Sequence, residues 1–385
     1  MLVNRRVIGS TSASAITFNS DTSALVLPSG TTAQRPASAI VGMLRYNTTL
    51  GSMEQYNATG WELIGGPVPT ISNIAGAILA GTSTTFTITG TNFGTDPLVV
   101  RFVSGATIVN STITPTSNTS ISAPVPSQIS ALSAGSTVTT TVINSRNLTS
   151  NSVNSTIYST PTGGNTVASS GGFRYHIFTS SGTMNFGTFN LPVNYLIVGG
   201  GSGGVQGHER GGAGAQVVVD TTSSYSSSVT VTVGSGGAAA TAGTDSSAFG
   251  VTAVGGRADG IGPTGAAVGS GGLGSGGRGG QQGGGQGPGG DGTYSALFTI
   301  NGNGEPDGWY GGGGGGAGGW GYETSPGGAG GKGGGGYGGT GYSCGIDGLA
   351  NTGGGGGGGG ISCCGTTYCP GKNGGSGIVI VRYAA

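Results

Sequence analysis

Apolar and polar residues alternate in short stretches along much of the chain. In residues 85–89, Phe86 and Ile88 fall on one side and threonines on the other, which is typical of a strand with one solvated face. Residues 98–103 and 136–144 are further runs of this kind. The pattern predicts an all-β fold built from short strands.

Turn residues divide residues 67–160 into roughly six or seven such strands, which predicts a β-sandwich. The segment contains PTISNIAGAILAGTSTTFTITGTNFG, followed by APVP and STVTTTVINSRNLTSNS. These motifs resemble the IPT/TIG class of immunoglobulin-like domains over nearly the whole segment. The resemblance implies a spacer or adhesion module without chemistry of its own, and direct contact with a ligand is the alternative.

Residues 1–66 contain three strand-like stretches separated by turns of Asn, Thr and Gly, at 42–47, 52–56 and 60–64. A β-meander of this size buries too little apolar surface to fold alone. Its larger apolar side chains are therefore expected to meet their equivalents on other copies of the chain. These interface candidates are Leu44, Tyr46, Met53, Tyr56, Trp61 and Leu63. Packing on the next domain of the same chain is the alternative.

The segment contains the motifs LPSGTTAQRPAS, GMLRYNTT and EQYNATGWELIG. These motifs resemble a small module repeated in tail-fibre and other virion fibre proteins of tailed phages, particularly marine ones. The resemblance covers about 40 residues of the chain. It implies an interwoven homotrimer with a structural role, which would attach to other virion proteins through this N-terminal segment.

Residues 161–385 begin and end with conventional strands, whose apolar residues predict a small β-sandwich. The predicted strands are 173–179, 194–198, 216–219, 229–233, 249–254 and 377–383. Composition separates this segment from the rest, because most of the 91 glycines lie after residue 171. No strict Gly-X-Y period appears among them, which excludes collagen.

The glycines within this segment follow a period of three. In residues 327–339 pairs of glycines alternate with one other residue, which places Ala329 and Lys332 three apart. This period matches the polyproline II helix, which has no internal hydrogen bonds. Helices packed side by side exchange backbone hydrogen bonds, each worth about 1 kcal/mol net, so an ordered lattice has to be extensive. The alternative is a long flexible tail. The strand that follows the glycines argues against a tail, because it has to return to the sheet.

This segment contains the motifs YHIFTSSGTMNFGTFNLPVNYLIVGGGSGG, GGAGAQVVV, VTVTVGSGG, GGGGGGAGGWG and GGSGIVIVRY. These motifs resemble the glycine-rich domain of phage tail-fibre adhesins and some bacterial surface proteins. The resemblance implies packed polyglycine II helices whose loops at the tip select a host surface. The order of the three segments then identifies a virion fibre or tail-fibre adhesin on the particle surface, made in the host cytoplasm. A fibre or spike that decorates capsid, neck or tail, without a dedicated receptor, is the alternative.

Charge and composition argue against several classes of protein. The chain carries 13 basic and 13 acidic residues and two histidines, so no basic surface for nucleic acid is expected. Few groups remain for acid–base catalysis, and we expect neither an enzyme nor a cofactor. The chain has no apolar run long enough to span a membrane. Its start has two arginines without an apolar core, so no secretion signal is expected.

The four cysteines are candidates for disulfides. They are Cys344, Cys363, Cys364 and Cys369. Their spacings lack the paired C-x-x-C of zinc sites, and a particle outside the cell favours oxidation, so two disulfides are expected. Free thiols and a metal site are the alternatives. A bond between the adjacent Cys363 and Cys364 is disfavoured as strained, and the other two pairings stay open.

Three further patterns are interpreted as structural. Residues 199–204 follow a strand with the spacing G-x-G-x-x-G, and Asp220 lies about 20 residues on, but residues 205–214 are too short and glycine-rich for the helix that dinucleotide binding requires. Residues 301–308 alternate oxygen ligands as calcium loops do, yet lack the closing glutamate, which favours a plain turn. His176 falls within a strand.

Aromatic residues gather between residues 290 and 345, where a glycine lattice offers no deep core to bury them. Exposed rings stack on sugar faces and anchor interfaces at low entropic cost. Loops 301–310 and 319–326 are therefore the predicted contacts for a host glycan or outer-membrane component. The receptor-binding candidates are Trp309, Tyr310, Trp320, Tyr322, Glu305 and Asp307. Covering of the glycine backbone is the alternative role for each ring.

Overall fold

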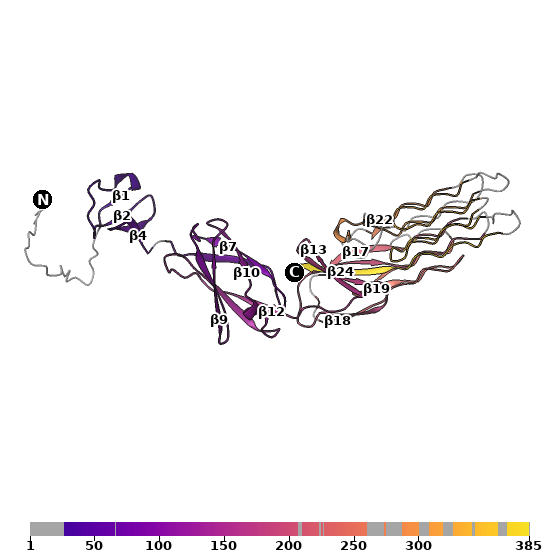
Figure 1. Cartoon of the computed structure of the whole chain (residues 1–385), viewed down its shortest axis with the longest axis horizontal. Coiled ribbons are helices and arrows are strands. Elements are labelled where there is room, and N and C mark those ends of the chain that lie inside the picture. The colour runs from indigo at the N-terminus through magenta and orange to yellow at the C-terminus, as the bar shows by residue number, and fades with distance from the viewer. Residues whose placement is uncertain are drawn as a thin grey trace, which may run out of the picture.

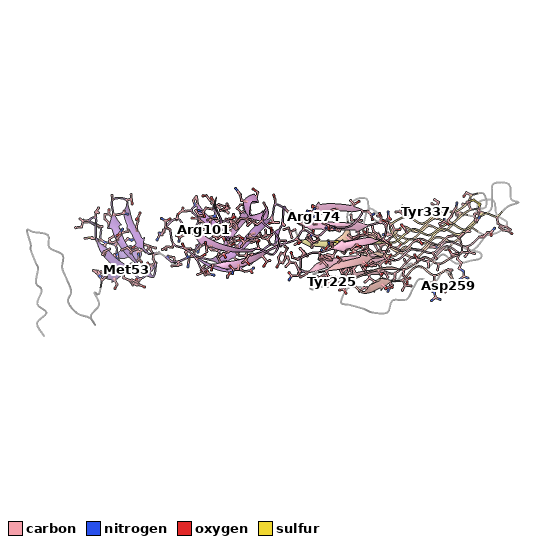
Figure 2. The ribbon with its side chains drawn as sticks, turned by 90° about the horizontal axis from the view of Figure 1, so that it is seen from below. Met53, Arg101, Arg174, Tyr225, Asp259 and Tyr337 are labelled. Carbon is pink, nitrogen blue, oxygen red and sulfur yellow. A yellow bond between two sulfur atoms is a disulfide. The ribbon has the colours of Figure 1, made fainter. Side chains whose placement is uncertain are left out.

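The computed structural model describes residues 27–65, 67–206, 210–222, 225, 227–259, 273–274, 287–299, 308–318, 326–340, 343–360 and 368–384. These residues form three β-rich units that follow one another along the long axis of the molecule (Figure 1). Met53 of the first unit and Tyr337 of the third lie near opposite ends of the described chain (Figure 2). The predicted all-β fold is confirmed, with α1 (Ser127–Ser130) as a single short α-helix among the described residues.

The first unit is a four-stranded sheet in the order β1-β2-β3-β4. Strands β2 to β4 form the predicted antiparallel meander, and β1 pairs in parallel with β2. The elements are β1 (Ser29–Gly30), the 3-10 helix η1 (Thr32–Gln34), β2 (Leu44–Asn47), β3 (Ser52–Asn57) and β4 (Gly60–Ile64). The Asn57 side chain closes the turn before β4, because its oxygen accepts the backbone N–H groups of Thr59 and Gly60.

The second unit is a β-sandwich of a three-stranded sheet, β10-β7-β5, and a five-stranded sheet, β6-β12-β11-β8-β9. Phe86 and Ile88 of β7 are fully buried, as their alternation predicts, and the Phe86 ring lies 6.3 Å from that of Phe102. The strands are β5 (Thr70–Ala75), β6 (Ile78–Leu79), β7 (Thr85–Thr91), β8 (Leu98–Ser104), β9 (Thr107–Ile113), β10 (Ser120–Pro124), β11 (Thr137–Ile143) and β12 (Val153–Tyr158).

The third unit begins with a six-stranded sheet in the order β13-β14-β24-β16-β17-β21. Its strands are β13 (Thr166–Ser170), β14 (Phe173–Phe178), β16 (Val193–Val198), β17 (Val217–Thr222), β21 (Leu273–Gly274) and β24 (Ile378–Ala384). The last strand of the chain, β24, lies between β14 and β16. Both of its faces are covered, because Val379 and Val381 join one apolar cluster and Ile378 and Ile380 join another. The unbroken apolar run in the sequence reflects this burial.

Three two-stranded sheets flank this sheet. They are formed by β15 (Gly182–Asn185) with β18 (Ser228–Val231), β19 (Ser246–Ala248) with β20 (Val251–Ala253), and β22 (Thr293–Tyr294) with β23 (Trp309–Tyr310). The first two complete the predicted sandwich, because Met184, Val231 and Ala253 share the apolar cluster of Val379.

The second and third units share an apolar core. Leu79 of β6 is fully buried in the cluster that contains Phe178 and Phe189 of the third unit. The Tyr158 ring meets the Phe189 ring edge-on, with centroids 6.0 Å apart. The boundary between these units is therefore a packed interface.

The glycine runs form extended rods that are packed side by side and extend away from the six-stranded sheet (Figure 1). In rod 352–360, the N–H of Gly355 donates to the oxygen of Gly312, and three residues later Gly358 donates to Gly315. The same interval of three recurs in the bonds between the other rods, as a polyglycine II lattice requires.

Rod 352–360 is surrounded by six neighbours, and this arrangement explains its eight consecutive glycines. It donates hydrogen bonds to some neighbours and accepts them from others, so no direction is free for a side chain. The neighbouring rods are 199–205, 210–216, 311–318, 334–340, 343–349 and 368–377.

Rods at the edge of the lattice carry one side chain per turn. In rod 326–333 the side chains of Ala329 and Lys332 are exposed, as their spacing of three predicts. Between them, a Cβ atom added to Gly330 would overlap the carbonyl oxygen of Gly335 in the next rod. The spacing of the non-glycine residues in such a rod therefore indicates which of its sides faces solvent.

Candidate functional site

Tyr310, one of the six predicted receptor-binding residues, is buried, which corrects the expectation that its ring is exposed. Its hydroxyl donates to the backbone oxygen of Phe298 over 2.9 Å, and burial raises the pKa of the phenol. Tyr310 and Phe298 cover the face of the six-stranded sheet that carries Leu196 and Ile380. The sheet thus supplies the apolar core that the glycine lattice lacks.

Trp309 is half-buried and lies on the outer side of the same hairpin. Because side chains alternate along a strand, Trp309 points outward where Tyr310 points inward. Tyr294 stands directly opposite Trp309 in the ladder between β22 and β23. Their ring centroids are 5.5 Å apart, and the Tyr294 side chain is 51% exposed. The structure therefore places two aromatic rings together on the surface.

Lys332 lies beside these rings, and the Asp291 side chain is bonded to its backbone. The Lys332 ammonium lies 5.2 Å from the centroid of the Trp309 ring, within cation–π distance. The Lys332 backbone is fixed by two bonds of 2.8 Å, because its N–H donates to Asp291 Oδ1 and its oxygen accepts the N–H of Gly292. We name Tyr294, Trp309, Lys332 and Asp291 the flank site. Sequence analysis named Trp309 as a candidate but not Tyr294, which it counted only within the aromatic stretch 290–345, and the contacts of Lys332 depend on which rods are neighbours.

The other four receptor-binding candidates, Glu305, Asp307, Trp320 and Tyr322, lie outside the described residues. The calcium-like run at residues 301–308 is described only at Gly308. The structure does describe the residues at which the chain leaves the lattice and enters it again. At four of them the flanking residues are joined or held by backbone hydrogen bonds, Val205 to Arg210, Gly318 to Gly339, Thr340 to Ser343, and Cys369 to Gly360.

These positions gather at one end of the lattice. Gly339 donates to Gly358 and Gly359 donates to Val205, so the rod ends near residues 205, 339 and 359 are side by side. The opposite rod ends begin at the six-stranded sheet, where Val198 precedes the first rod. Four connections of the chain, including predicted loop 319–326, are therefore rooted at the end farthest from the sandwich (Figure 1). We name this region the distal end.

A disulfide between Cys344 and Cys369 lies near the distal end. It joins rods 343–349 and 368–377, which are neighbours because Gly348 donates to the oxygen of Asn373. The sequence argument left open the two pairings that join Cys344 to Cys363 or to Cys364. The observed bond joins Cys344 to Cys369 instead, and it belongs to the pairing that was disfavoured because its second bond would join Cys363 to Cys364. Adjacency of the two rods decides the partner. Cys363 and Cys364 lie outside the described residues.

The predicted interface residues of the first unit divide between the two faces of its sheet. Leu44, Tyr46 and Met53 share one face with Ile64, and each of the four side chains is between 36% and 42% exposed. The remaining three, Tyr56, Trp61 and Leu63, lie half-buried on the other face. Sequence analysis missed Ile64, whose alternation with Leu63 in β4 indicates the same face as Met53.

The covered face of this sheet contains a buried charged cluster. Glu54 is fully buried and accepts hydrogen bonds from Arg35 at 2.7 Å and Asn47 at 2.9 Å, and Arg45 lies 3.5 Å away. The hydrogen bond from Arg35 holds the pKa of the Glu54 carboxyl below its usual range. The covered face therefore combines a buried charged cluster with the half-buried rings of Tyr56 and Trp61, and four apolar side chains remain on the exposed face.

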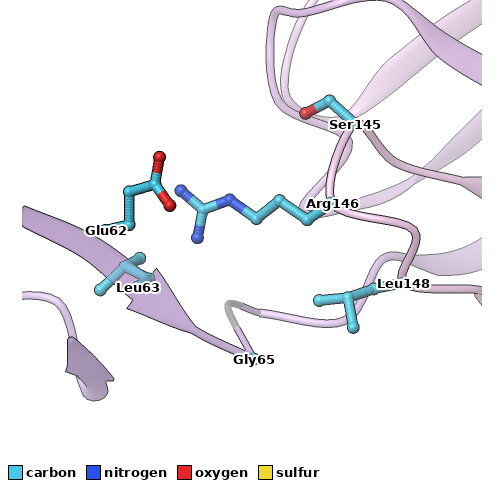
Figure 3. Close-up of a pocket in the computed structure, with 6 residues that line it drawn as sticks. All are labelled: Glu62, Leu63, Gly65, Ser145, Arg146 and Leu148. Atoms are coloured by element: carbon cyan, nitrogen blue, oxygen red, sulfur yellow. The ribbon is translucent and has the colours of Figure 1, made fainter. Parts of the chain in front are cut away.

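A cavity of about 420 Å³ lies between the first and second units (Figure 3). Glu62 and Arg146 point toward one another across it. A second cavity of about 290 Å³ shares Leu63, Ser145 and Arg146 with it. The Asn144 side chain in its wall already accepts the N–H groups of Arg146 and Leu148. We interpret this region as a hinge with polar walls, since the connection runs through Gly65, Pro67 and Pro69.

His176 is a buried structural residue, as its place in a strand predicts. One ring nitrogen lies 2.7 Å from the oxygen of Gly163 and the other 3.2 Å from the Tyr383 hydroxyl. Burial lowers the pKa of the imidazole. Residues 199–204, which carry the G-x-G-x-x-G spacing, form a rod of the lattice and are not followed by a helix in the described residues.

Metal clusters and membrane-spanning helices are both absent from the described residues. No group of three or more His, Cys, Asp or Glu side chains is placed to hold a metal ion in that part of the chain. Among the same residues, no helix has the length and apolar character needed to cross a membrane.

The fold agrees with a comparison against known protein families. Residues 177–384 match the family described as the glycine-rich domain, which is more than half of the chain. No curated protein matches the chain. The matched region begins in β14 and ends with β24, and so contains both the six-stranded sheet and the rods. The chain therefore belongs to the glycine-rich domain family.

Proposed function

We propose that the chain is a structural fibre protein of a phage virion, and that its glycine-rich domain binds the surface of the host cell. The observation that carries this proposal is the distal end, where four connections of the chain are rooted on one lattice. Binding residues in proteins are often found on loops held by a rigid scaffold. The order of the units supports the same assignment, because the distal end lies farthest from the N-terminal unit (Figure 1).

The lattice suits this role because it holds the roots of the loops in place. Each rod is tied to its neighbours by backbone hydrogen bonds, so the positions from which the loops leave do not depend on the loops themselves. Sequence changes between the rods would then alter the bound surface without altering the scaffold. No catalytic step is part of this proposal, which needs only binding.

The proposal includes a homotrimer held by the first unit. Its sheet exposes Leu44, Tyr46, Met53 and Ile64 on one face, while the other face is covered and contains the buried Glu54. An exposed apolar sheet face is stabilised when it is covered, and other copies of the chain present an identical face. The resemblance of this unit to virion fibre modules favours three copies and an attachment to other virion proteins.

Sedimentation of the full chain tests the assembly. We expect a mass of three chains, and Met53→Glu should shift it toward the mass of one chain. Thr48→Glu is the matched control, because Thr48 is exposed in the turn between β2 and β3 and should leave the mass unchanged. A monomeric parent chain at micromolar concentration would contradict the assignment.

Binding of the labelled full chain to host cells tests the receptor role. The full chain is used because the second and third units share a core, and a cut between them would expose Leu79 and Phe189. We expect saturable binding that excess unlabelled chain abolishes. Binding that does not saturate would instead favour a decorating fibre or spike without a dedicated receptor.

A further inference from the structure

We infer that the flank site binds a glycan, with one sugar ring stacked on Tyr294 and Trp309 and its hydroxyl groups held by Lys332 and Asp291. This inference rests on the proposed function in that a host surface supplies the glycan. It adds a second contact region, because the flank site lies near β22, where the sheet meets the lattice, and not at the distal end (Figure 1).

The exposed ring of Tyr294 and the half-buried ring of Trp309 form a platform. Their centroids are 5.5 Å apart and their planes are inclined by 48°. Tyr294 keeps about half of its side-chain surface in solvent, although an aromatic ring of this size gains free energy from burial. The C–H face of a sugar ring is apolar and flat, and it would cover this surface.

The rings are not needed to close the core beneath them. Phe298 and Tyr310 already cover the six-stranded sheet, and both are fully buried. Tyr294 and Trp309 lie on the outer side of that cover, since residues alternate between the two sides of the short ladder. A role in covering the sheet therefore explains Tyr310 but leaves the exposed area of Tyr294 without a partner in the described chain.

The polar groups beside the rings match the hydroxyl groups of a sugar. A hydroxyl both donates and accepts hydrogen bonds, so its recognition requires both kinds of partner. The Lys332 ammonium is a donor, the Asp291 carboxylate is an acceptor, and both side chains are exposed. A purely apolar partner would leave these two charges beside a dry surface, which disfavours a hydrophobic peptide or a lipid chain.

The flank site is also held in place before a ligand arrives. Strands β22 and β23 fix the two rings, and rod 326–333 carries Lys332 with its peptide bonded on both sides. Binding to groups that are already ordered costs less conformational entropy than binding to a mobile loop. The rigid lattice therefore favours a measurable affinity from a small contact area.

Defined oligosaccharides test the inference. The full chain is applied to an array of oligosaccharides built from hexoses, N-acetylhexosamines and uronic acids, and each one that binds is titrated in solution by calorimetry. Loss of one stacking ring in Tyr294→Ala should weaken binding by about tenfold, and Lys332→Gln should weaken it by a smaller factor. Tyr337→Ala is the matched control, because Tyr337 is equally exposed on the lattice but lies outside the flank site.

The outcomes separate this inference from the proposed function. A thermal unfolding curve like that of the parent chain shows that each variant is folded, and Tyr294→Phe, which keeps the ring, should bind nearly as well as the parent. The inference is overturned if the parent chain binds no oligosaccharide on the array, or if Tyr294→Ala and Lys332→Gln bind as tightly as Tyr337→Ala. In either case, saturable binding to host cells would leave the proposed function intact. Conversely, oligosaccharide binding that depends on Tyr294, without binding to cells, would support the site and contradict the host-binding role.

Discussion

The two halves of the glycine-rich domain are held together by different forces. In the sandwich, apolar side chains such as Ile197 and Val379 are fully buried between sheets. In the lattice, the eight glycines 353–360 have no side chains to bury and are joined to their neighbours by backbone hydrogen bonds. One continuous chain thus passes from a core of side chains to a core of peptide groups, and β16 and β24 are the strands that connect the two.

This difference predicts opposite responses to mutation. A side-chain core is disturbed in proportion to the volume removed or added, and swaps of similar volume are tolerated. In the glycine rods, a Cβ added at most inward positions would overlap a neighbouring carbonyl oxygen, while outward side chains such as Lys332 meet water. Side chains that are buried in the lattice, such as those of Ser202 and Ala213, are small. Four experiments examine this contrast, in order of decreasing expected effect.

The largest effect is expected from valine in an inward position of a rod. Gly330→Val places a Cβ against the Gly335 oxygen, so rods 326–333 and 334–340 have to separate. We expect a loss of more than about 4 kcal/mol in the free energy of unfolding, measured by urea denaturation. Ala329→Val is the control, because the preceding side chain is exposed and should change stability by less than about 0.5 kcal/mol. Equal effects at the two positions would contradict the lattice.

A graded effect is expected in the sandwich. Ile197 is fully buried in β16, and Ile197→Ala should lower the free energy of unfolding by about 2–5 kcal/mol. Ile197→Val removes one methylene and should cost about 0.5–1.5 kcal/mol. Both are measured by urea denaturation. If the smaller change were as damaging as the larger one, the side-chain core would resemble the lattice, and the contrast would fail.

The disulfide should contribute less than Gly330 and no more than the upper part of the range for Ile197→Ala. Cys344 and Cys369 are 25 residues apart in sequence, and closing a loop of this length restricts the unfolded chain. Cys344→Ser should therefore lower the free energy of unfolding by about 3 kcal/mol under oxidising conditions. Reductant should destabilise the parent chain more than this variant. A variant as stable as the oxidised parent would show that the rods hold this end of the lattice without the bond.

The smallest effect is a pH dependence that belongs to the sandwich. Burial lowers the pKa of His176 in the folded state, so the unfolded chain takes up a proton first as the pH falls. Stability is therefore full above the ordinary histidine pKa of about 6.5 and declines below it, by at most about 1.4 kcal/mol per pH unit. Denaturation between pH 7.5 and 5.5 measures this slope. The slope should be smaller in His176→Gln, and an unchanged slope would assign it to another group.

Local pattern predicted the period of the rods and the strands with clear apolar alternation or runs, but not the more polar strands β13 and β15. Phe86 and Ile88 mark one face of β7, and the spacing of Ala329 and Lys332 marks the exposed side of a rod. Each of these features is decided within a few residues, by alternation along a strand or by three residues per turn.

Features that depend on neighbours distant in sequence were not predictable. The disulfide partner of Cys344 is decided by two rods lying side by side, and the placement of Lys332 over Trp309 is decided in the same way. In the first unit, the pairing of Tyr46 with Met53 decides which apolar residues share a face. The composition of these residues contains no information about that register.

The core shared by the second and third units has a mechanical consequence. A force applied at the distal end would pass with little deformation through the interface that contains Leu79 and Phe189, because both side chains belong to one packed apolar cluster. Bending would then concentrate where Gly65 and Pro67 join the first unit. The second and third units would then move as one rigid body. Because this body is long, a small rotation at the joint would produce a large displacement of the distal end.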